Sequence, residues 1–272
     1  MTSTLETPPR PPAPAILPGK VVLVAGAGPD LGRALAVRAA EAGADVVLAA
    51  RDAARLEEIA AQVRATGRRA LAVPTDLTDS AARHALVAAA VEAFGRVDVL
   101  AYAAFTHTND EKLLEVDLDL VRSTTDVNVL AALGLVQALA PTLTAHGGSV
   151  VLVNSIVIRN RLAGYGSYRM DKAALLAAAR SLSVELGPQG VRVNSVAPGY
   201  IWADKLRRSF ERLEKRGVTT VEKMYGQIAA QTDSRRLPTP DEIADAALFL
   251  ASDLASGVTG QCLDVTCGQS HN

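Results

Sequence analysis

The sequence is poor in aromatic residues and in cysteine, and it carries almost no net charge. Aromatic side chains make up 4% of its 272 residues, the only cysteines are Cys262 and Cys267, and the formal net charge is −1. Two cysteines at this spacing form neither a metal-binding pattern nor a disulfide framework, so we expect no metal site and a reducing, cytoplasmic environment. Because the basic residues are scattered, we also expect no nucleic-acid or membrane partner.

Long hydrophobic runs are also missing. No run approaches the roughly 18 apolar residues of a membrane span, and no charged segment followed by an apolar run marks a signal peptide. The N-terminus instead has six prolines between Pro8 and Pro18. Such composition is typical of extended or disordered chain, so we expect residues 1–19 to form a tail outside one folded domain at 20–272.

From Lys20 onward, apolar segments alternate with alanine-rich amphipathic ones. The pattern predicts about seven strands, at 21–25, 45–50, 69–73, 97–102, 149–154, 191–196 and 261–265. It predicts helices at 31–43, 53–66, 80–94, 118–145, 166–187 and 239–252. This alternation indicates a single α/β domain, a Rossmann-like doubly wound parallel sheet with helices on both faces. The charged, helical segment 203–236 interrupts it after a strand, where α/β sheets bind ligands, so we interpret it as a substrate lid.

Tyr168 and Lys172 lie four residues apart in a predicted helix and therefore on one face of it. A neighbouring ammonium stabilises phenolate, so we expect the pKa of Tyr168 to be lowered, which suits proton exchange with an alcohol or ketone. Tyr165 is a poorer candidate because Arg169 stands four residues after it, and arginine does not titrate. Ser155 ends the preceding strand, where its hydroxyl can point at the start of the helix.

Asn128 lies within an otherwise apolar helical segment. A buried amide must find hydrogen-bond partners. Two interpretations remain open: a structural hydrogen bond, with a helix kink, or an amide that holds a water molecule beside the lysine.

A glycine-rich turn joins the first predicted strand and helix. Gly26, Gly28 and Gly32 would let the backbone approach a pyrophosphate, and the helix that starts at Leu31 would offer its amide groups. The second strand ends in Arg51, with no carboxylate for a ribose hydroxyl, which favours NADP(H) over NAD(H). Alternatively, Arg51 is a surface residue that opens the next helix, with Asp52 as its cap.

Further cofactor contacts are expected at the ends of later strands. Asp76, followed by Leu77, could bind the adenine amino group or cap a helix. The small side chain of Ala103 would let a flat ring pass, although plain strand packing explains it equally well. A turn at Pro198 and Gly199 would leave the backbone of Ile201 facing a ligand.

Together these features resemble the short-chain dehydrogenase/reductase family from residue 20 to about residue 268. The four residues that match its catalytic tetrad are Asn128, Ser155, Tyr168 and Lys172. The resemblance implies that Tyr168 exchanges the proton and that Lys172 lowers its pKa and binds the nicotinamide ribose. It also implies that Ser155 holds the substrate oxygen, that Asn128 holds a water molecule, and that the chain forms a homotetramer or homodimer.

Three positions depart from the family pattern. Asp30 replaces a glycine of the first turn, where its carboxylate would either repel pyrophosphate or bond a backbone amide. Residues 101–104 read Ala-Tyr-Ala-Ala in place of Asn-Asn-Ala-Gly. Ala203 replaces the threonine that normally binds the nicotinamide amide.

The expected function is hydride transfer between NADP(H) and a carbonyl or secondary alcohol of a medium or bulky apolar small molecule. The expected substrate-binding residues are Phe105, Ser155, Ile156, Tyr165 and Trp202, although lid aromatics could equally pack against their own domain. One alternative is an NAD(H)-dependent alcohol dehydrogenase of the same family. Another is a non-catalytic dinucleotide-binding sensor or scaffold.

Overall fold

A computed structural model describes residues 11–107, 112–159 and 163–271. Within them, seven parallel strands form one sheet in the order β3-β2-β1-β4-β5-β6-β7. The strands are β1 (Val21–Ala25), β2 (Asp45–Ala50), β3 (Ala70–Pro74), β4 (Val99–Tyr102), β5 (Ser149–Val153), β6 (Arg192–Pro198) and β7 (Cys262–Val265). The predicted Rossmann-like fold is confirmed. Parallel pairing places every strand's carboxyl end at the same edge of the sheet.

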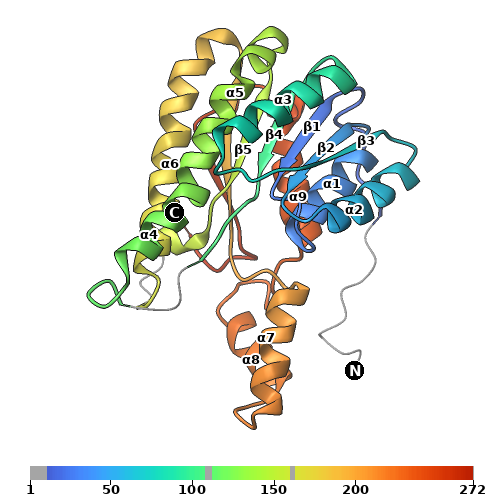
Figure 1. Ribbon diagram of the computed structural model, residues 1–272. Coiled ribbons are helices and arrows are strands. Elements are labelled where there is room, and N and C mark those ends of the chain that lie inside the picture. Colours follow the sequence, from blue (N-terminus) through green and yellow to red (C-terminus); the bar gives the residue numbers. More distant parts are fainter. Residues whose placement is uncertain (1–10, 108–111, 160–162, 272) are drawn as a thin grey trace.

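Helices cover both faces of the sheet (Figure 1). One face is covered by α1 (Leu31–Glu41), α2 (Ala53–Ala65) and α9 (Pro240–Ala251), and the other by α3 (Ser80–Phe94), α5 (Ala131–His146) and α6 (Gly166–Leu186). Strand β1 is buried throughout, with valine and leucine side chains alternating between the two cores. This double burial explains why its sequence is a continuous apolar run.

The helix predicted at 118–145 consists of three parts. Helix α4 (Leu118–Thr125) passes through the π-helical turn η1 (Asp126–Leu130) into α5. The combined segment Leu118–His146 is long and apolar enough to cross a membrane, contrary to the expectation of no such run, and 44% of its most apolar stretch is buried. Leucines 135, 139 and 143 pack it onto the sheet, so its hydropathy is that of a core helix.

The described part of the N-terminal segment, residues 11–19, belongs to the folded domain. Leu17 is fully buried, and its N–H donates to the carbonyl of Ala42 at 2.9 Å. Arg38 donates to the carbonyl of Pro11 at 2.7 Å. The prediction of a disordered tail is therefore wrong for 11–19, because groups on α1 satisfy this extended backbone. Residues 1–10 lie outside the described residues.

The segment predicted as a lid forms α7 (Asp204–Lys215) and α8 (Val221–Ala229), which project from the body of the molecule (Figure 1). The two helices share a small apolar core of their own, hereafter the lid core: Trp202, Phe210, Val221, Met224, Tyr225, Ala229 and Leu237. At its base the Trp202 N–H donates to the Pro238 carbonyl at 2.8 Å. Three short helices complete the list: η2 (Ile156–Ile158), η3 (Gly187–Gln189) and η4 (Asp253–Ala255).

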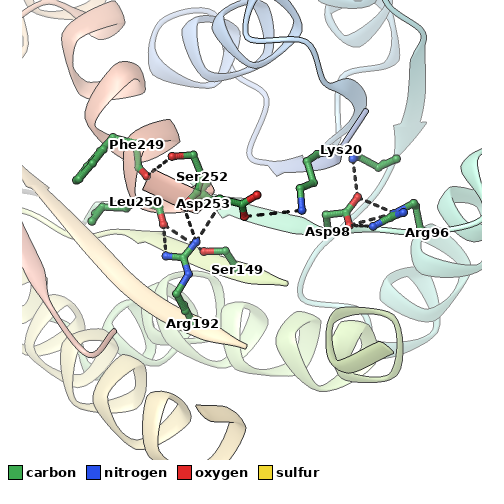
Figure 2. Close-up of polar contacts among 11 residues, drawn as sticks. Lys20, Arg96, Asp98, Ser149, Arg192, Phe249, Leu250, Ser252 and Asp253 are labelled. Carbon is green, nitrogen blue, oxygen red and sulfur yellow. Dashed lines mark hydrogen bonds and ion pairs between the residues drawn. The ribbon is translucent and has the colours of Figure 1, made fainter. Parts of the chain in front are cut away.

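Buried polar groups tie together the amino-terminal edge of the sheet (Figure 2). Asp98, with 2% of its surface exposed, accepts from the Val21 N–H at 2.8 Å and pairs with Arg96. Arg192 donates to three carbonyls at the end of α9: Leu250 at 2.5 Å, Ala251 at 3.0 Å and Ser252 at 2.9 Å. These contacts close this edge, whereas the predicted site residues lie at the opposite, carboxyl edge.

Candidate active site

The end of β5 and the start of α6 bring Ser155, Tyr168 and Lys172 together. The Ser155 side chain lies beside the Tyr168 hydroxyl and acts to lower its pKa, and the Ser155 hydroxyl accepts from the Val157 N–H at 3.2 Å. The Lys172 ammonium lies 5.8 Å from the centroid of the Tyr168 ring and donates to the Val153 carbonyl at 2.7 Å. The three side chains expected to catalyse proton exchange are therefore neighbours.

Burial shifts both titrating groups toward their neutral forms. Desolvation raises the pKa of Tyr168; the Asp171 carboxylate adds to this, and the Ser155 hydrogen bond opposes it. Desolvation lowers the pKa of Lys172 to about 8, against the opposing effect of Asp171. The expected lowering of the Tyr168 pKa is not found, because loss of hydration disfavours phenolate more than the neighbouring groups favour it.

Asn128 lies fully buried in the π-helical turn. Its amide oxygen accepts from the Thr106 N–H at 2.8 Å, and its amide nitrogen donates to the Thr106 carbonyl at 2.9 Å and to Asp171 at 2.8 Å. Both amide hydrogens are used within the protein. The structural hydrogen bond and helix irregularity anticipated for Asn128 are both present, and a water-holding role stays a prediction.

Aromatic rings surround the hydroxyl pair. The Phe105 ring, half exposed at 49%, lies 6.3 Å from the Tyr168 ring. The His107 ring lies 4.9 Å from the Tyr168 ring and 5.6 Å from the Tyr165 ring. His107 was not among the predicted residues, because an isolated histidine in a loop carries no spacing signal. Phe105 thus lies beside Tyr168, and His107 contacts both Tyr168 and Tyr165, while substrate binding by Phe105 and Tyr165 stays a prediction.

The other two predicted substrate-binding residues are buried. Ile156 follows Ser155 directly and is 5% exposed. Trp202 is 6% exposed and packs edge-on against Tyr225, at 4.7 Å between ring centroids, in the lid core. The alternative reading of Trp202, packing within the lid, therefore accounts for its position.

The glycine turn forms a cradle that fits a dinucleotide phosphate. A side chain at Gly26 would place its Cβ 2.3 Å from the Ala104 nitrogen, and one at Gly32 would lie 2.3 Å from the Gly26 carbonyl oxygen. A side chain at Gly28 would face open space, because the nearest atom to its Cβ, the Gly26 carbonyl oxygen, is 3.9 Å away. Helix α1 begins at Leu31 with no side-chain cap, so its first amides remain available to an anion.

Asp30 turns toward α7. Its carboxylate accepts from the N–H of Lys205 at 3.4 Å, in the first turn of α7. Ala203, at the N-cap of that helix, offers no side-chain hydrogen bond. The carboxylate therefore bonds a backbone amide, which is the second of the two outcomes expected for Asp30.

A tyrosine replaces the missing asparagines as a brace for β4. Tyr102 is fully buried, and its hydroxyl donates to the Val127 carbonyl in η1 at 2.6 Å. Burial raises the pKa of Tyr102, so the hydroxyl stays a donor. The next residue, Ala103, donates its N–H to the Ala25 carbonyl at 2.7 Å, which holds the strand against the glycine turn.

Arg51 and Asp76 follow β2 and β3 at the carboxyl edge. The Thr78 hydroxyl and N–H donate to Asp76 at 2.7 and 2.9 Å and lower its pKa, and the Arg51 charge lowers it further. The cap of α3 is Asp79, so Asp76 does not cap that helix. Asp52 caps α2, as the alternative interpretation of Arg51 requires.

The remaining predicted cofactor residues lie along the same edge. Leu77 is 7% exposed and packs into the core under α3. Pro198 ends β6, and a side chain at Gly199 would meet the Gln269 amide oxygen at 2.6 Å. Ile201 packs partly buried, and its carbonyl accepts from the Ala203 N–H at 2.9 Å. Among the residues described, no group of histidine, cysteine, aspartate and glutamate could hold a metal ion.

Comparison with known proteins agrees with this geometry. The family model described as enoyl-(acyl carrier protein) reductase matches residues 26–270. The L-rhamnose 1-dehydrogenase (NAD(P)(+)) of Sphingomonas sp. strain SKA58 is 37% identical over 94% of this chain and 98% of its own. The 7alpha-hydroxysteroid dehydrogenase of Escherichia coli K12 is 33% identical over 93% of this chain and 94% of its own.

A solved structure has the same architecture. Carveol dehydrogenase from Mycobacterium avium, in complex with NAD, superposes with a TM-score of 0.87 and 27% identity, over 94% of this chain and 99% of that one. The similarity therefore spans the sheet, the site and the lid. The chain belongs to the short-chain dehydrogenase/reductase family and is an NAD(P)-dependent oxidoreductase acting on alcohol or carbonyl groups.

Proposed function

We propose that the protein transfers a hydride between NADP(H) and the carbonyl or secondary alcohol carbon of a medium or bulky apolar molecule. The observation that carries the proposal is the grouping of Ser155, Tyr168 and Lys172 at the sheet edge that holds the glycine cradle. The bound nicotinamide supplies or accepts the hydride. The chain's own residues bind, orient and exchange the proton.

Each residue has a distinct task in this proposal. The Tyr168 hydroxyl donates a proton to the oxygen of a ketone during reduction, or accepts it from an alcohol during oxidation. The Ser155 hydroxyl, beside that of Tyr168, holds the same oxygen where negative charge develops. Lys172 places positive charge beside the phenol and binds the nicotinamide ribose. Asn128 holds the loop at Thr106 against α6.

The preference for NADP(H) rests on Arg51. Its side chain is exposed at the end of β2, and Ala50 before it offers no carboxylate to a ribose hydroxyl. A guanidinium there suits a 2′-phosphate. NAD(H) is the alternative: one relative is named as an NAD(P)(+) enzyme, and carveol dehydrogenase was solved with NAD.

The aromatic neighbours of Tyr168 support an apolar substrate. Phe105, His107 and Tyr165 present ring surfaces near the reacting hydroxyl. Two relatives are named for a hydroxysteroid and for carveol, and one for L-rhamnose. The ring surfaces favour the first two kinds over a sugar.

Self-association and a cytoplasmic location complete the proposal. Exposed apolar side chains lie along α4, α6 and the turn between α4 and α5: Leu118, Leu130, Met170 and Val184. These would be covered in a homotetramer or homodimer. The low cysteine content is compatible with a reducing compartment.

The decisive test is the variant Tyr168→Phe, with Tyr165→Phe as its matched control. Turnover is followed by nicotinamide absorbance with NADPH and NADH, against a panel of bulky apolar ketones and alcohols. Tyr168→Phe should lose at least about 100-fold in turnover, the scale of a general acid–base contribution, while cofactor affinity by calorimetry stays unchanged. Tyr165→Phe should keep turnover within a few-fold.

Two results would overturn the proposal. Near-normal turnover of Tyr168→Phe would remove Tyr168 from the proton transfer. Cofactor binding without turnover of any panel member by the unmodified protein would favour the non-catalytic sensor or scaffold.

A further inference from the structure

The buried carboxylate of Asp171 lies on α6, next to the proposed catalytic residues Tyr168 and Lys172. Asp171 directly precedes Lys172 on α6 and is 2% exposed. Its two oxygens accept from the Thr125 hydroxyl at 2.6 Å and from the Asn128 amide at 2.8 Å. Both donors are neutral, so among the described residues this carboxylate is held by a hydroxyl and an amide and not by an ion pair.

The donors come from another part of the helical layer. Thr125 ends α4, and Asn128 lies in the middle of the π-helical turn η1. Asp171 thereby fastens α6, which carries Tyr168 and Lys172, to the segment that holds the Thr106 loop. A buried carboxylate is costly unless it is fully hydrogen-bonded, so its presence here calls for a reason beyond packing.

Asp171 and Lys172 point to different sides of α6, although the Asp171 carboxylate still acts on the Lys172 ammonium. Consecutive helical residues point about 100° apart, so Asp171 faces η1 while Lys172 faces β5. The Lys172 ammonium meets one carbonyl, that of Val153, and is otherwise buried. The Asp171 carboxylate is the acidic group that opposes the effect of burial on the pKa of Lys172.

We propose that Asp171 is a positioning residue, which locks α6 to Asn128 and keeps Lys172 in its charged form. The inference rests on the proposed function and deepens it. An asparagine at position 171 could still bond both partners, accepting from Asn128 and donating to Thr125, but it could not favour the ammonium. The carboxylate also raises the pKa of Tyr168, so its removal shifts both groups in the same direction.

Other ionisable side chains lie on the elements that surround α6, and the test must separate them from Asp171. They are His107 after β4, Arg122 on α4, Asp126 in η1, Arg159 after η2, Arg169 on α6, Arg192 on β6 and Lys205 on α7. Arg159 is paired with Asp264, and Arg192 is bound to carbonyls at the opposite edge. The variants below leave all of these residues unchanged except the control.

The test variant is Asp171→Asn, which keeps the shape and can donate to Thr125 while accepting from Asn128. The matched control is Asp126→Asn, which removes the same charge from an exposed position on the neighbouring turn. Without the carboxylate, the pKa of Tyr168 and of Lys172 should both fall. The oxidation rate should rise with pH, and the reduction rate should fall with pH. The midpoints of both pH–rate profiles should lie about one pH unit lower in Asp171→Asn than in the unmodified protein. Neither should move in Asp126→Asn.

A uniform loss of turnover at every pH, with no displacement of the profile, would mean that Asp171 only supports the structure and would overturn the proposal. So would a profile that superimposes on that of the unmodified protein. If Asp171→Asn does not fold, Asp171→Ser, a smaller neutral residue with room for water, gives the same comparison.

A second readout needs no turnover. An NMR titration of the lysine Cε chemical shifts against pH reports the pKa of Lys172 directly. The Lys172 signal is identified as the one that is missing from the spectrum of Lys172→Met. It should be near 8 in the unmodified protein and about one unit lower in Asp171→Asn. If turnover is never found but this shift occurs, the proposed function fails while the role of Asp171 in charging Lys172 stands. An unchanged pKa overturns the inference alone.

Discussion

Tyr168 and Lys172 illustrate how burial acts on single residues. A spacing of four residues on a helix correctly indicates that the ammonium lies near the phenol. Their protonation depends instead on the free energy of removing each charged form from water. This cost raises the pKa of Tyr168 and lowers that of Lys172. Groups that contact the pair, Ser155 and Asp171, then set the balance.

Arg51 provides a test at the same scale. Arg51→Ala should weaken NADP(H) binding about 10- to 100-fold, because it removes a charge-assisted contact to the 2′-phosphate, and leave NAD(H) binding unchanged. Titration calorimetry with both cofactors measures this. Arg55→Ala, a nearby exposed arginine paired with the capping Asp52, is the control. Equal weakening for both cofactors would contradict a role for Arg51 in selecting NADP(H).

The π-helical turn η1 is the element on which several parts of the site converge. Its i→i+5 register interrupts the α-helix, and the Tyr102 hydroxyl donates to the backbone carbonyl of Val127 within it. Asn128 in the same turn binds the Thr106 loop and Asp171. The turn therefore connects β4, the loop after it and α6.

Removal of the Tyr102 hydroxyl should loosen this element. Tyr102→Phe leaves the Val127 carbonyl without its donor, so the free energy of unfolding should fall by about 1 to 3 kcal/mol, measured by chemical denaturation. The control is Tyr200→Phe, a half-buried tyrosine whose hydroxyl makes no hydrogen bond within the described parts of the chain. If the two variants were equally stable, Tyr102 would not be the brace that replaces the missing asparagines.

Across the whole molecule, the two edges of the sheet have different tasks. The amino edge is held by buried polar contacts such as Asp98 with Val21 and Arg96 (Figure 2). The carboxyl edge carries the glycine cradle, Arg51 and the hydroxyls of Ser155 and Tyr168. Loss of a polar contact at the amino edge should therefore lower the free energy of unfolding without changing cofactor affinity.

Asp98→Ala tests this division. The variant leaves the Val21 N–H and the Arg96 guanidinium without their acceptor, so the free energy of unfolding should fall by about 3 kcal/mol. Cofactor affinity of the folded protein should be unchanged. Asp119→Ala, which removes an exposed pair with Arg122, should cost less than about 1 kcal/mol. A large loss of cofactor affinity in Asp98→Ala would show that the edges are coupled.

The sequence by itself determined the α/β alternation, the strand positions to within a few residues, the glycine turn and the Ser155–Tyr168–Lys172 set. These features are local, because strand and helix periodicity and spacing within one strand–helix unit are written in neighbouring residues. It also indicated that Asp30 could bond a backbone amide, without showing which amide.

Only the tertiary structure decided the contacts between distant segments. Asp171 meets Asn128 across 43 residues of sequence, and Asp30 meets the Lys205 amide across 175. Tertiary contacts likewise decided the packing of residues 11–19 on α1 and the raised pKa of Tyr168. Each depends on which surfaces the folded chain removes from water and brings together, and no periodicity or composition in the sequence encodes that locally.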